Sequence, residues 1–313
     1  MSNPFNVLPN KPLFSKNVLL VGGAVRDKLL GREPKDHDYV IVGATDADVE
    51  AMCNEGYTQV GADFPVFLHP TTGDEYALAR IERKSGAGYH GFTVQADSSV
   101  TIEDDLARRD LTVNSMAMDN EGNLIDPFHG VHDMHNHVLR HTTEAFAEDP
   151  LRVLRLARFA ARFVDWKVAP ETVELCKQIG EAGELNHLTV ERVWVEMEKA
   201  FSEKAPHRFM EVLMECNAIE HCDVMSRLFA PFGPMQLAFA KALGLVPKDR
   251  RLYVAVGVLS QHDVAMCGGP SRAQDCFLNV SGLASAASAA DLLGVLKRAR
   301  AQQESEQFND LVM

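Results

Sequence analysis

Residues 21–43 constrain the fold of this chain more than any other stretch. They read VGGAVRDKLLGREPKDHDYVIVG and follow a short apolar run at residues 18–20. That run predicts a buried strand, and the two glycines after it allow a tight turn that brings the backbone close to a ligand. Residues 24–30 have helical spacing and stop at Gly31, a residue type that often ends helices. A strand, a glycine turn and a short helix are therefore predicted in direct succession.

Two acidic residues, Asp36 and Asp38, stand at the start of a second predicted strand, which Pro34 leads into and which runs to Val42. Alternate residues of a strand point to the same side, so we expect both carboxylates on one face. They repel each other unless a cation lies between them, and hard oxygen ligands suit Mg²⁺, which also takes substrate phosphates. A Mg²⁺ site beside a glycine turn predicts metal-assisted phosphoryl or nucleotidyl transfer.

The order of short motifs in this stretch is more specific than any of them alone. The chain has neither the G-x-x-x-x-G-K-[ST] nor the G-x-G-x-x-G pattern. G-G-x-V-R-D, L-L-G-R and P-K-D-x-D follow one another, and this order resembles the head signature of the class II tRNA nucleotidyltransferases of the polymerase β superfamily. These are the CCA-adding enzymes and bacterial poly(A) polymerases. The resemblance implies an α+β fold, with a polymerase-β-like nucleotidyltransferase head of mixed sheet and helices at residues 1–143. An all-α neck (144–220) and a shortened helical body and tail (221–313) would follow.

The resemblance also implies roles for particular residues of the head. Asp36 and Asp38 would bind the Mg²⁺ ions, and Glu75 would be a third catalytic acid on the neighbouring strand, although an edge-strand glutamate in solvent fits the sequence equally well. Gly23 and Arg26 would grip the triphosphate. The glycine-rich residues 84–92 resemble a flexible loop that helps the switch from C to A addition.

A second motif, DDLARRD at residues 104–110, resembles the family's R-R-D motif. Arg109 would offer a fixed fork to phosphate oxygens or to the sugar. Asp110 would orient that arginine or a ribose hydroxyl. Arginines flanked by acids are also common in surface salt bridges, so the order of the motifs is what favours the nucleotide site.

Residues 147–163, AEDPLRVLRLARFAARF, predict a helix with Pro150 in its first turn. At about 100° per residue, one arc is apolar and the neighbouring arc carries arginines. The apolar arc comprises Val153, Leu156, Ala157, Ala160 and Phe163, and the basic arc comprises Arg152, Arg155, Arg158 and Arg162. We therefore expect a helix that packs by one side and lines a cleft with guanidinium groups.

The start of this helix resembles the E-D-x-x-R motif with which the family selects the nucleobase. The resemblance implies that Asp149 and Arg152 read the Watson–Crick edge of the incoming C or A, whereas G and U present a different pattern. Arg155 and Arg158 would hold the nucleotide and its phosphates.

Net charge, apolar runs, cysteines and histidines limit the kinds of surface and metal site that this chain can have. The formal net charge of −13 argues against a broad basic surface, so a polynucleotide would need locally clustered arginines. No apolar run is long enough to span a bilayer and no signal-peptide layout begins the chain, so we expect a cytoplasmic protein. Six scattered cysteines favour reduced thiols, and the five histidines at residues 129–141 favour a structural role. Bacterial members of the family that this chain resembles continue into a metal-dependent HD phosphohydrolase domain, which needs several metal ligands. The single His262-Asp263 pair indicates only a degenerate remnant of that domain.

The predicted function is CCA tRNA nucleotidyltransferase: template-independent addition of C, C and A to the tRNA 3′ acceptor end from CTP and ATP, with release of pyrophosphate. Two alternatives stay open. One is a poly(A) polymerase or an enzyme that adds only part of CCA, although poly(A) relatives usually carry a basic pair where residues 60–64 stand. The other is a non-catalytic RNA-binding protein. The sequence leaves the oligomeric state open.

Overall fold

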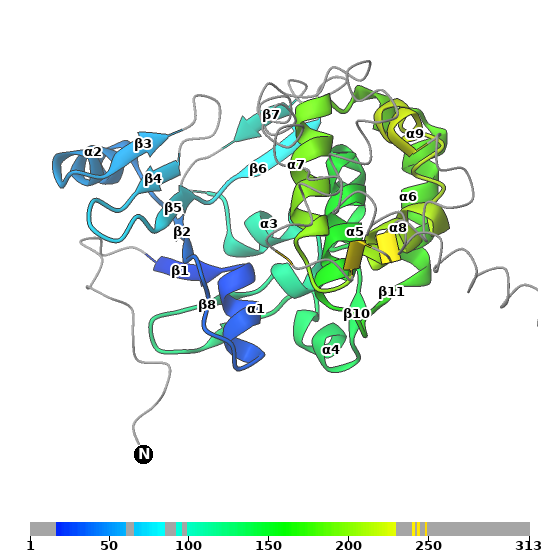
Figure 1. Cartoon of the computed structure of the whole chain (residues 1–313). Helices are drawn as coiled ribbons and strands as arrows, with labels where there is room; N and C mark the ends of the chain where they lie inside the picture. The colour runs from blue at the N-terminus through cyan, green and yellow to red at the C-terminus, as the bar shows by residue number, and fades with distance from the viewer. Residues whose placement is uncertain are drawn as a thin grey trace, which may run out of the picture. The chain divides into compact units, whose positions relative to one another are not determined.

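The computed structural model describes residues 17–60, 66–84, 92–95, 99–229 and five positions between 240 and 248. The chain divides into two compact units, Met1–Asp149 and Pro150–Met313 (Figure 1). A mixed sheet with helices forms the first unit and helices dominate the second, which confirms the predicted α+β class. The finer division into parts at residues 143 and 220 stays a prediction.

A seven-stranded sheet in the order β3-β4-β5-β2-β1-β8-β9 forms the centre of the first unit (Figure 1). β1 lies antiparallel to both β2 and β8, whereas β2 and β5 are parallel. A separate antiparallel pair consists of β6 and β7. The strands are β1 (Asn17–Val21), β2 (Asp38–Val42), β3 (Thr58–Val60), β4 (Val66–Leu68), β5 (Glu75–Leu78), β6 (Ile81–Lys84), β7 (Phe92–Gln95), β8 (Ala117–Met118), β9 (Leu124–Ile125) and β10 (Val138–Leu139).

Two predicted strands are wrong in their bounds. The second strand begins at Asp38 and leaves Asp36 in a bend before it. The pairing of the strands explains this start: Asp38 is paired with the last residue of β1 and with the first residue of β5. The residue before it, His37, accepts one backbone hydrogen bond from the N–H of Glu75 at 3.2 Å but is not part of the strand pairing. The sequence also predicts a single strand from Val60 to Leu68. The structure has the antiparallel pair β3 and β4 instead, in which Val60 pairs with Val66.

Short helices connect and cover the strands of the first unit. Thr45 as an N-cap residue and Asp46 in the first turn predict a helix at residues 45–54. The structure confirms it as α2, in which Thr45 closes a capping box with Asp48. Thr101 caps α3 in the same way by accepting a hydrogen bond from the backbone N–H of Asp104. The helices are α1 (Gly23–Leu29), α2 (Asp46–Asn54), α3 (Ile102–Ala107) and α4 (Gly130–His135), with 3₁₀ turns at η1 (Thr112–Asn114) and η2 (Glu144–Glu148).

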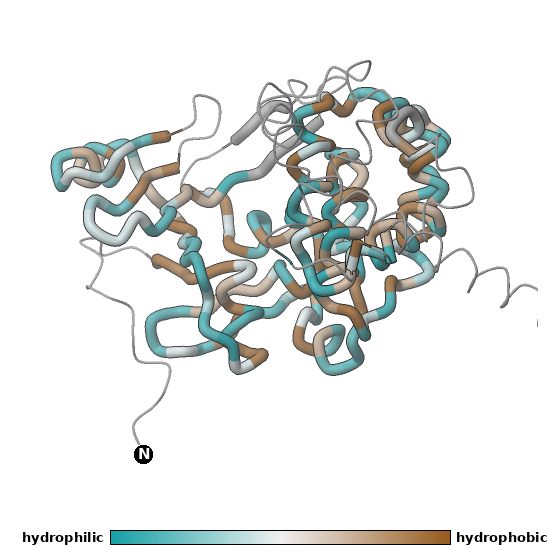
Figure 2. Tube along the Cα trace, viewed as in Figure 1, coloured by the Kyte–Doolittle hydropathy of each residue, from teal (hydrophilic) through white to brown (hydrophobic). Residues whose placement is uncertain are grey.

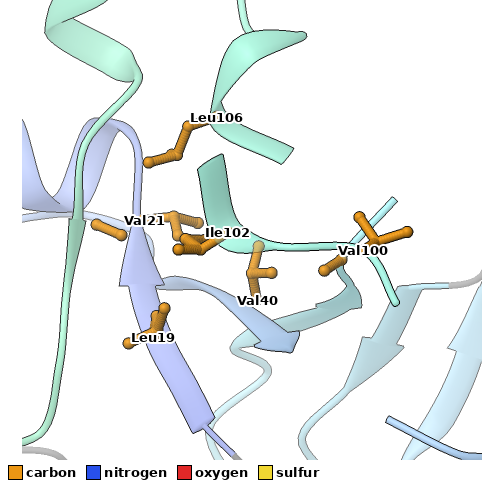
Figure 3. Close-up of a cluster of buried hydrophobic side chains, with 8 residues drawn as sticks. Leu19, Val21, Val40, Val100, Ile102 and Leu106 are labelled. Atoms are coloured by element: carbon orange, nitrogen blue, oxygen red, sulfur yellow. The ribbon is translucent and has the colours of Figure 1, made fainter. Parts of the chain in front are cut away.

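An apolar cluster joins α3 to the central strands. Leu19 and Val21 of β1 and Val40 of β2 pack with Ile102 and Leu106 of α3 (Figure 3). The hydrophobic colouring of β1 in Figure 2 marks the same strand. Burying a leucine side chain contributes about 1.5–3 kcal/mol, so the fully buried Leu106 helps, together with Ile102, to anchor this short helix to the sheet. The residues next to Leu106 in α3 are thereby held in place.

The second unit is helical, and α5 carries the predicted apolar arc. All five arc residues are buried, which confirms the predicted packing face. α5 packs against α7 and α8. The elements are α5 (Leu151–Arg162), β11 (Lys167–Val168), α6 (Pro170–Glu181), η3 (Glu184–His187), α7 (Val190–Phe201), α8 (Pro206–Glu215) and α9 (Asp223–Phe229).

Some sequence features lie outside the described residues: most of the glycine-rich loop, the His262-Asp263 pair and the basic end of the tail. Within the described ranges, none of the helices combines the length and the apolar character that crossing a bilayer requires.

Candidate active site

Asp38 and Glu75 lie side by side where their two strands begin. They are direct partners in the parallel pairing of β2 with β5. On its other side, Asp38 is the partner of Val21, the residue that ends β1 just before the glycine turn. At one end of the neighbouring strands β5, β2 and β1, a glutamate, an aspartate and the turn at Gly22 therefore follow one another.

The charged groups at these strand ends shift one another's pKa values. Asp38 is half-buried, and burial raises its pKa; the Arg109 guanidinium opposes that rise, and the negative charge of Asp36 adds to it. The pKa of Glu75 is raised as well, first by its partial burial and then by the negative charges of Asp38 and Asp36. Asp36 lies outside the strand and is exposed, yet its charge acts on both other carboxyl groups. The three predicted acids are thus brought into one electrostatic cluster.

This cluster does not by itself enclose an ion. In the part of the chain that the structure describes, no group of three His, Cys, Asp or Glu side chains is arranged to hold a metal. The carboxylates are hard oxygen donors, and cations that keep several waters suit a site of this kind.

The glycine turn depends on the absence of a side chain at Gly22. Its φ of 68° lies in the region that favours glycine, and its N–H donates to the carbonyl of Met116 at 3.0 Å. A Cβ atom at this position would lie 2.7 Å from Nη1 of Arg109. Gly23 begins α1, where a Cβ would lie 3.4 Å from Nη2 of Arg26. Two guanidinium groups therefore lie against the turn.

Arg109 is held by a residue that the sequence prediction did not single out. Its Nε and Nη2 donate to Oδ2 of Asp105 at 3.3 and 3.1 Å. Asp110, predicted to orient this arginine or a ribose hydroxyl, accepts hydrogen bonds from the backbone N–H of Leu111 and from Nδ2 of Asn114, and its role toward a ribose stays a prediction. The sequence offered a signal for Asp105, because residues four apart share a face of a helix.

Arg26, the other guanidinium beside the turn, is 2% exposed. Its Nε donates to Oδ1 of Asp27 at 2.9 Å, and its Nη1 donates to Oδ1 of Asn114. Asn114 in turn donates to Asp110 at 3.0 Å. No local pattern points to Asn114, since it stands 88 residues after Arg26.

The remaining predicted residues divide between the two units. Asp149 ends the first unit and is half-buried, and Arg152, Arg155 and Arg158 follow on α5 in the second. Arg152 is buried, and the other two are half-buried. Arg158 donates through Nε to Oε2 of Glu196 on α7 at 2.6 Å, and both side chains are close to fully buried. Sequence reasoning missed Glu196, and the prediction that these arginines face the carboxylates stays a prediction.

The comparisons with known families agree with the geometry. Residues 18–140 match the poly A polymerase head domain. Residues 165–222 match a family described as the probable RNA and SrmB-binding site of polymerase A.

The relatives carry related names. The multifunctional CCA protein of Methylobacillus flagellatus is 56% identical over 221 residues, which cover 71% of this chain and 53% of that protein. The CCA-adding enzyme of Pseudomonas putida is 59% identical over 202 residues, covering 64% of this chain and 54% of its own length. The chain spans about half the length of these relatives.

A solved structure shares the fold. The crystal structure of the Bacillus stearothermophilus CCA-adding enzyme in complex with CTP superposes with a TM-score of 0.64 at 26% identity, covering 86% of this chain and 66% of that one. With the head-domain match and the sequence relatives, this shows that the chain is similar to CCA-adding enzymes by sequence and by fold, and that its residues 18–140 belong to the poly A polymerase head-domain family.

Proposed function

We propose that this chain is a CCA tRNA nucleotidyltransferase that adds C, C and A to the 3′ end of tRNA from CTP and ATP and releases pyrophosphate. One observation carries the proposal. Asp38 is paired with Glu75 at the start of their two strands, beside the Gly22 turn, and Arg109 lies against that turn. Acids to bind a metal and amides and guanidinium groups to bind phosphates thus meet at one place. We propose the same division of labour as in the sequence prediction, with chemistry in residues 1–143, base selection in 144–220 and tRNA contacts in 221–313, and we expect the reaction in the cytoplasm.

Asp36 and Asp38 fit Mg²⁺. Their donors are hard oxygens, and the raised pKa of Asp38 reflects, after burial, a repulsion that a divalent cation would relieve. Among the described residues no third side chain joins these two in a metal-binding group, so phosphate oxygens and water would fill the rest of the coordination shell. When bound, the ions lower the pKa of the tRNA 3′-hydroxyl and neutralise charge on the leaving pyrophosphate. Glu75 keeps a third negative charge beside Asp38.

The glycine turn and the guanidinium groups around it would bind the triphosphate. Gly23 would bring its backbone close to the phosphates, and Arg26 would supply positive charge beside Gly23. Arg109 lies against Gly22, where the glycine lacks a side chain. The chain would then lower the barrier mainly by positioning and by charge stabilisation, since the nucleophile is the hydroxyl of the tRNA itself.

Base selection would belong to the start of α5. Asp149 accepts and Arg152 donates at the Watson–Crick edge of C or A, while Arg155 and Arg158 hold the nucleotide and its phosphates. Glu196 fixes one edge of the Arg158 guanidinium, so the Arg158 contribution would come from its other nitrogens.

The experiment that tests this function is product sequencing. The protein is incubated with Mg²⁺, all four nucleotides and a tRNA that lacks its last three nucleotides. The expected product ends in C, C and A, with neither G nor U incorporated. Tails of A on an unrelated RNA from ATP alone would favour a poly(A) polymerase, and CC or A alone would favour a partial enzyme. Binding of the tRNA without incorporation would favour a non-catalytic RNA-binding protein.

A further inference from the structure

Asp105 is a buried carboxylate that serves two arginines at once. Its side chain is 0% exposed. Oδ1 accepts from Nε and Nη2 of Arg108 at 3.1 and 2.6 Å, and Oδ2 accepts from Nε and Nη2 of Arg109. The backbone N–H of Arg80 adds a contact to Oδ1 at 3.4 Å. Each oxygen therefore fixes one edge of one guanidinium group.

The geometry leaves a single nitrogen of Arg109 facing the glycine turn. Both of the other nitrogens donate to Asp105, and within the described ranges Nη1 makes no hydrogen bond. Nη1 is the atom that would lie 2.7 Å from a Cβ at residue 22. Arg109 also acts electrostatically on Asp38, so this nitrogen lies near the carboxylate cluster. A donor is thus aimed at the place where we have proposed that the triphosphate binds.

Asp105 is suited to hold this arrangement throughout the neutral pH range. Burial favours its protonated form, but Arg109 and then Arg108 together lower its pKa below the usual value. Leu106, the next residue, is fully buried among the strands, so the backbone that carries Asp105 is anchored. An ionised carboxylate on an anchored helix keeps the Arg109 fork in one orientation before any ligand arrives.

We propose that Asp105 is a positioning residue for nucleotide binding: it grips Arg109 by its Nε/Nη2 edge and directs Nη1 across the Gly22 turn toward a triphosphate oxygen. This inference rests on the proposed function. Gly22 is the matching half of the arrangement, since only a residue without a side chain leaves room for Nη1. A purely structural Asp105 would stabilise α3 and leave the affinity for nucleotide unchanged.

A double-mutant cycle on the full-length protein tests the proposal. The KM for CTP and kcat are measured for wild type, Asp105→Asn, Arg109→Ala and the double variant, with urea unfolding of each. If Asp105 acts through Arg109, Asp105→Asn raises KM roughly tenfold, the loss typical of one charge-assisted hydrogen bond, with little change in kcat. The double variant is then no worse than Arg109→Ala alone.

Two outcomes of the cycle overturn the proposal. One is an unchanged KM in a folded Asp105→Asn protein. The other is a KM increase in the double variant that equals the product of the two single increases, which marks independent roles. If wild type itself incorporates no CTP, the proposed function fails instead, so the two failures are distinguishable.

A second pair of variants leaves Asp105 intact. Gly22→Ala places a methyl group against Nη1, and we expect a KM increase of roughly tenfold or more. Gly31→Ala is the control: Gly31 also has a positive φ, of 66°, but a Cβ there would meet nothing within 4 Å. Its KM should stay that of wild type. Equal KM values for Gly22→Ala and wild type would refute the placement of Nη1, even if Asp105→Asn does not fold.

Discussion

Two charged sites, one in each unit of the molecule, differ in how their charges are compensated. In the first unit, strand register brings Glu75 beside Asp38, and Asp36 adds a third negative charge; after burial, this repulsion contributes to a raised pKa of Asp38 and of Glu75. In the second unit, α5 places Arg158 against Glu196, and a hydrogen-bonded ion pair of 2.6 Å compensates both charges. Like charges that gather with only partial compensation indicate a place for a ligand, whereas a closed pair indicates a contribution to the fold.

Arg109 shares features of both sites: part of its guanidinium is in a closed ion pair, and its charge also acts on Asp38 of the carboxylate cluster. One edge of its guanidinium is compensated by Asp105, as in a structural pair, and the remaining nitrogen lies at the glycine turn. We therefore expect that removing the charge of Asp38 stabilises the fold, whereas removing the charge of Glu196 destabilises it.

The largest effect is expected at Asp38. Asp38→Asn keeps the shape of the side chain and removes the charge that would bind metal, so CTP incorporation should fall by about 10³-fold or more. The same variant should be more stable to urea without metal, because it removes repulsion from Asp36 and a desolvated charge. Incorporation assays and urea unfolding measure the two quantities. A stable variant with more than a tenth of wild-type activity would contradict the assignment of the site.

The pH dependence of stability sharpens the same comparison. The folded-state pKa of Asp38 is raised, so its protonated form favours folding: this contribution is complete at acid pH, below the unfolded-state pKa, and is lost as pH rises through the folded-state pKa. The stability advantage of Asp38→Asn over wild type should therefore grow as pH rises from about 4 to 7. Urea midpoints without metal at several pH values check it, and a constant difference would count against the raised pKa.

In the second unit, breaking the closed pair should cost stability. Glu196→Gln leaves Arg158 buried without its counter-charge, and we expect a loss of about 3 kcal/mol in the free energy of unfolding. Glu211→Gln is the matched control, because its pair with Arg208 is more exposed and should contribute less than about 1 kcal/mol. Chemical denaturation of both variants measures the difference. Equal losses would show that burial of the pair has no special importance.

The smallest effects are expected at two helix caps, one in each unit. Thr101 belongs to a full capping box in the first unit, and Thr101→Ala should destabilise the protein by about 1 kcal/mol. Thr189 in the second unit accepts one long hydrogen bond of 3.5 Å from the N–H of Arg192, so Thr189→Ala should cost about 0.5 kcal/mol. Thermal or urea unfolding gives the ranking, and a larger loss at Thr189 would reverse our comparison of the caps.

Local periodicity predicted the elements whose residues are close in sequence. β1 with its glycine turn, the capped α2 and the buried arc of α5 are confirmed, because strand alternation and helical spacing are properties of a few consecutive residues. The predicted start of β2 was wrong because it depends on where β1 ends and where β5 begins. The reversal between β3 and β4 lies within residues 60–68, which were predicted as one strand.

The site shows the same limit. Asp105 and Arg109 are four residues apart on one helix face, so their contact could have been predicted. Arg26 meets Asn114 across 88 residues and Arg158 meets Glu196 across 38, and only the tertiary fold brings such pairs together.

Electron paramagnetic resonance of Mn²⁺, used in place of Mg²⁺, tests the central claim most directly. The protein is titrated with Mn²⁺ in the presence of CTP, as wild type and as Asp38→Asn. If the carboxylate cluster beside the glycine turn binds the metal and the nucleotide phosphates together, wild type binds Mn²⁺ and the folded variant binds it at least about tenfold more weakly. Equal Mn²⁺ affinity in both proteins would contradict the account.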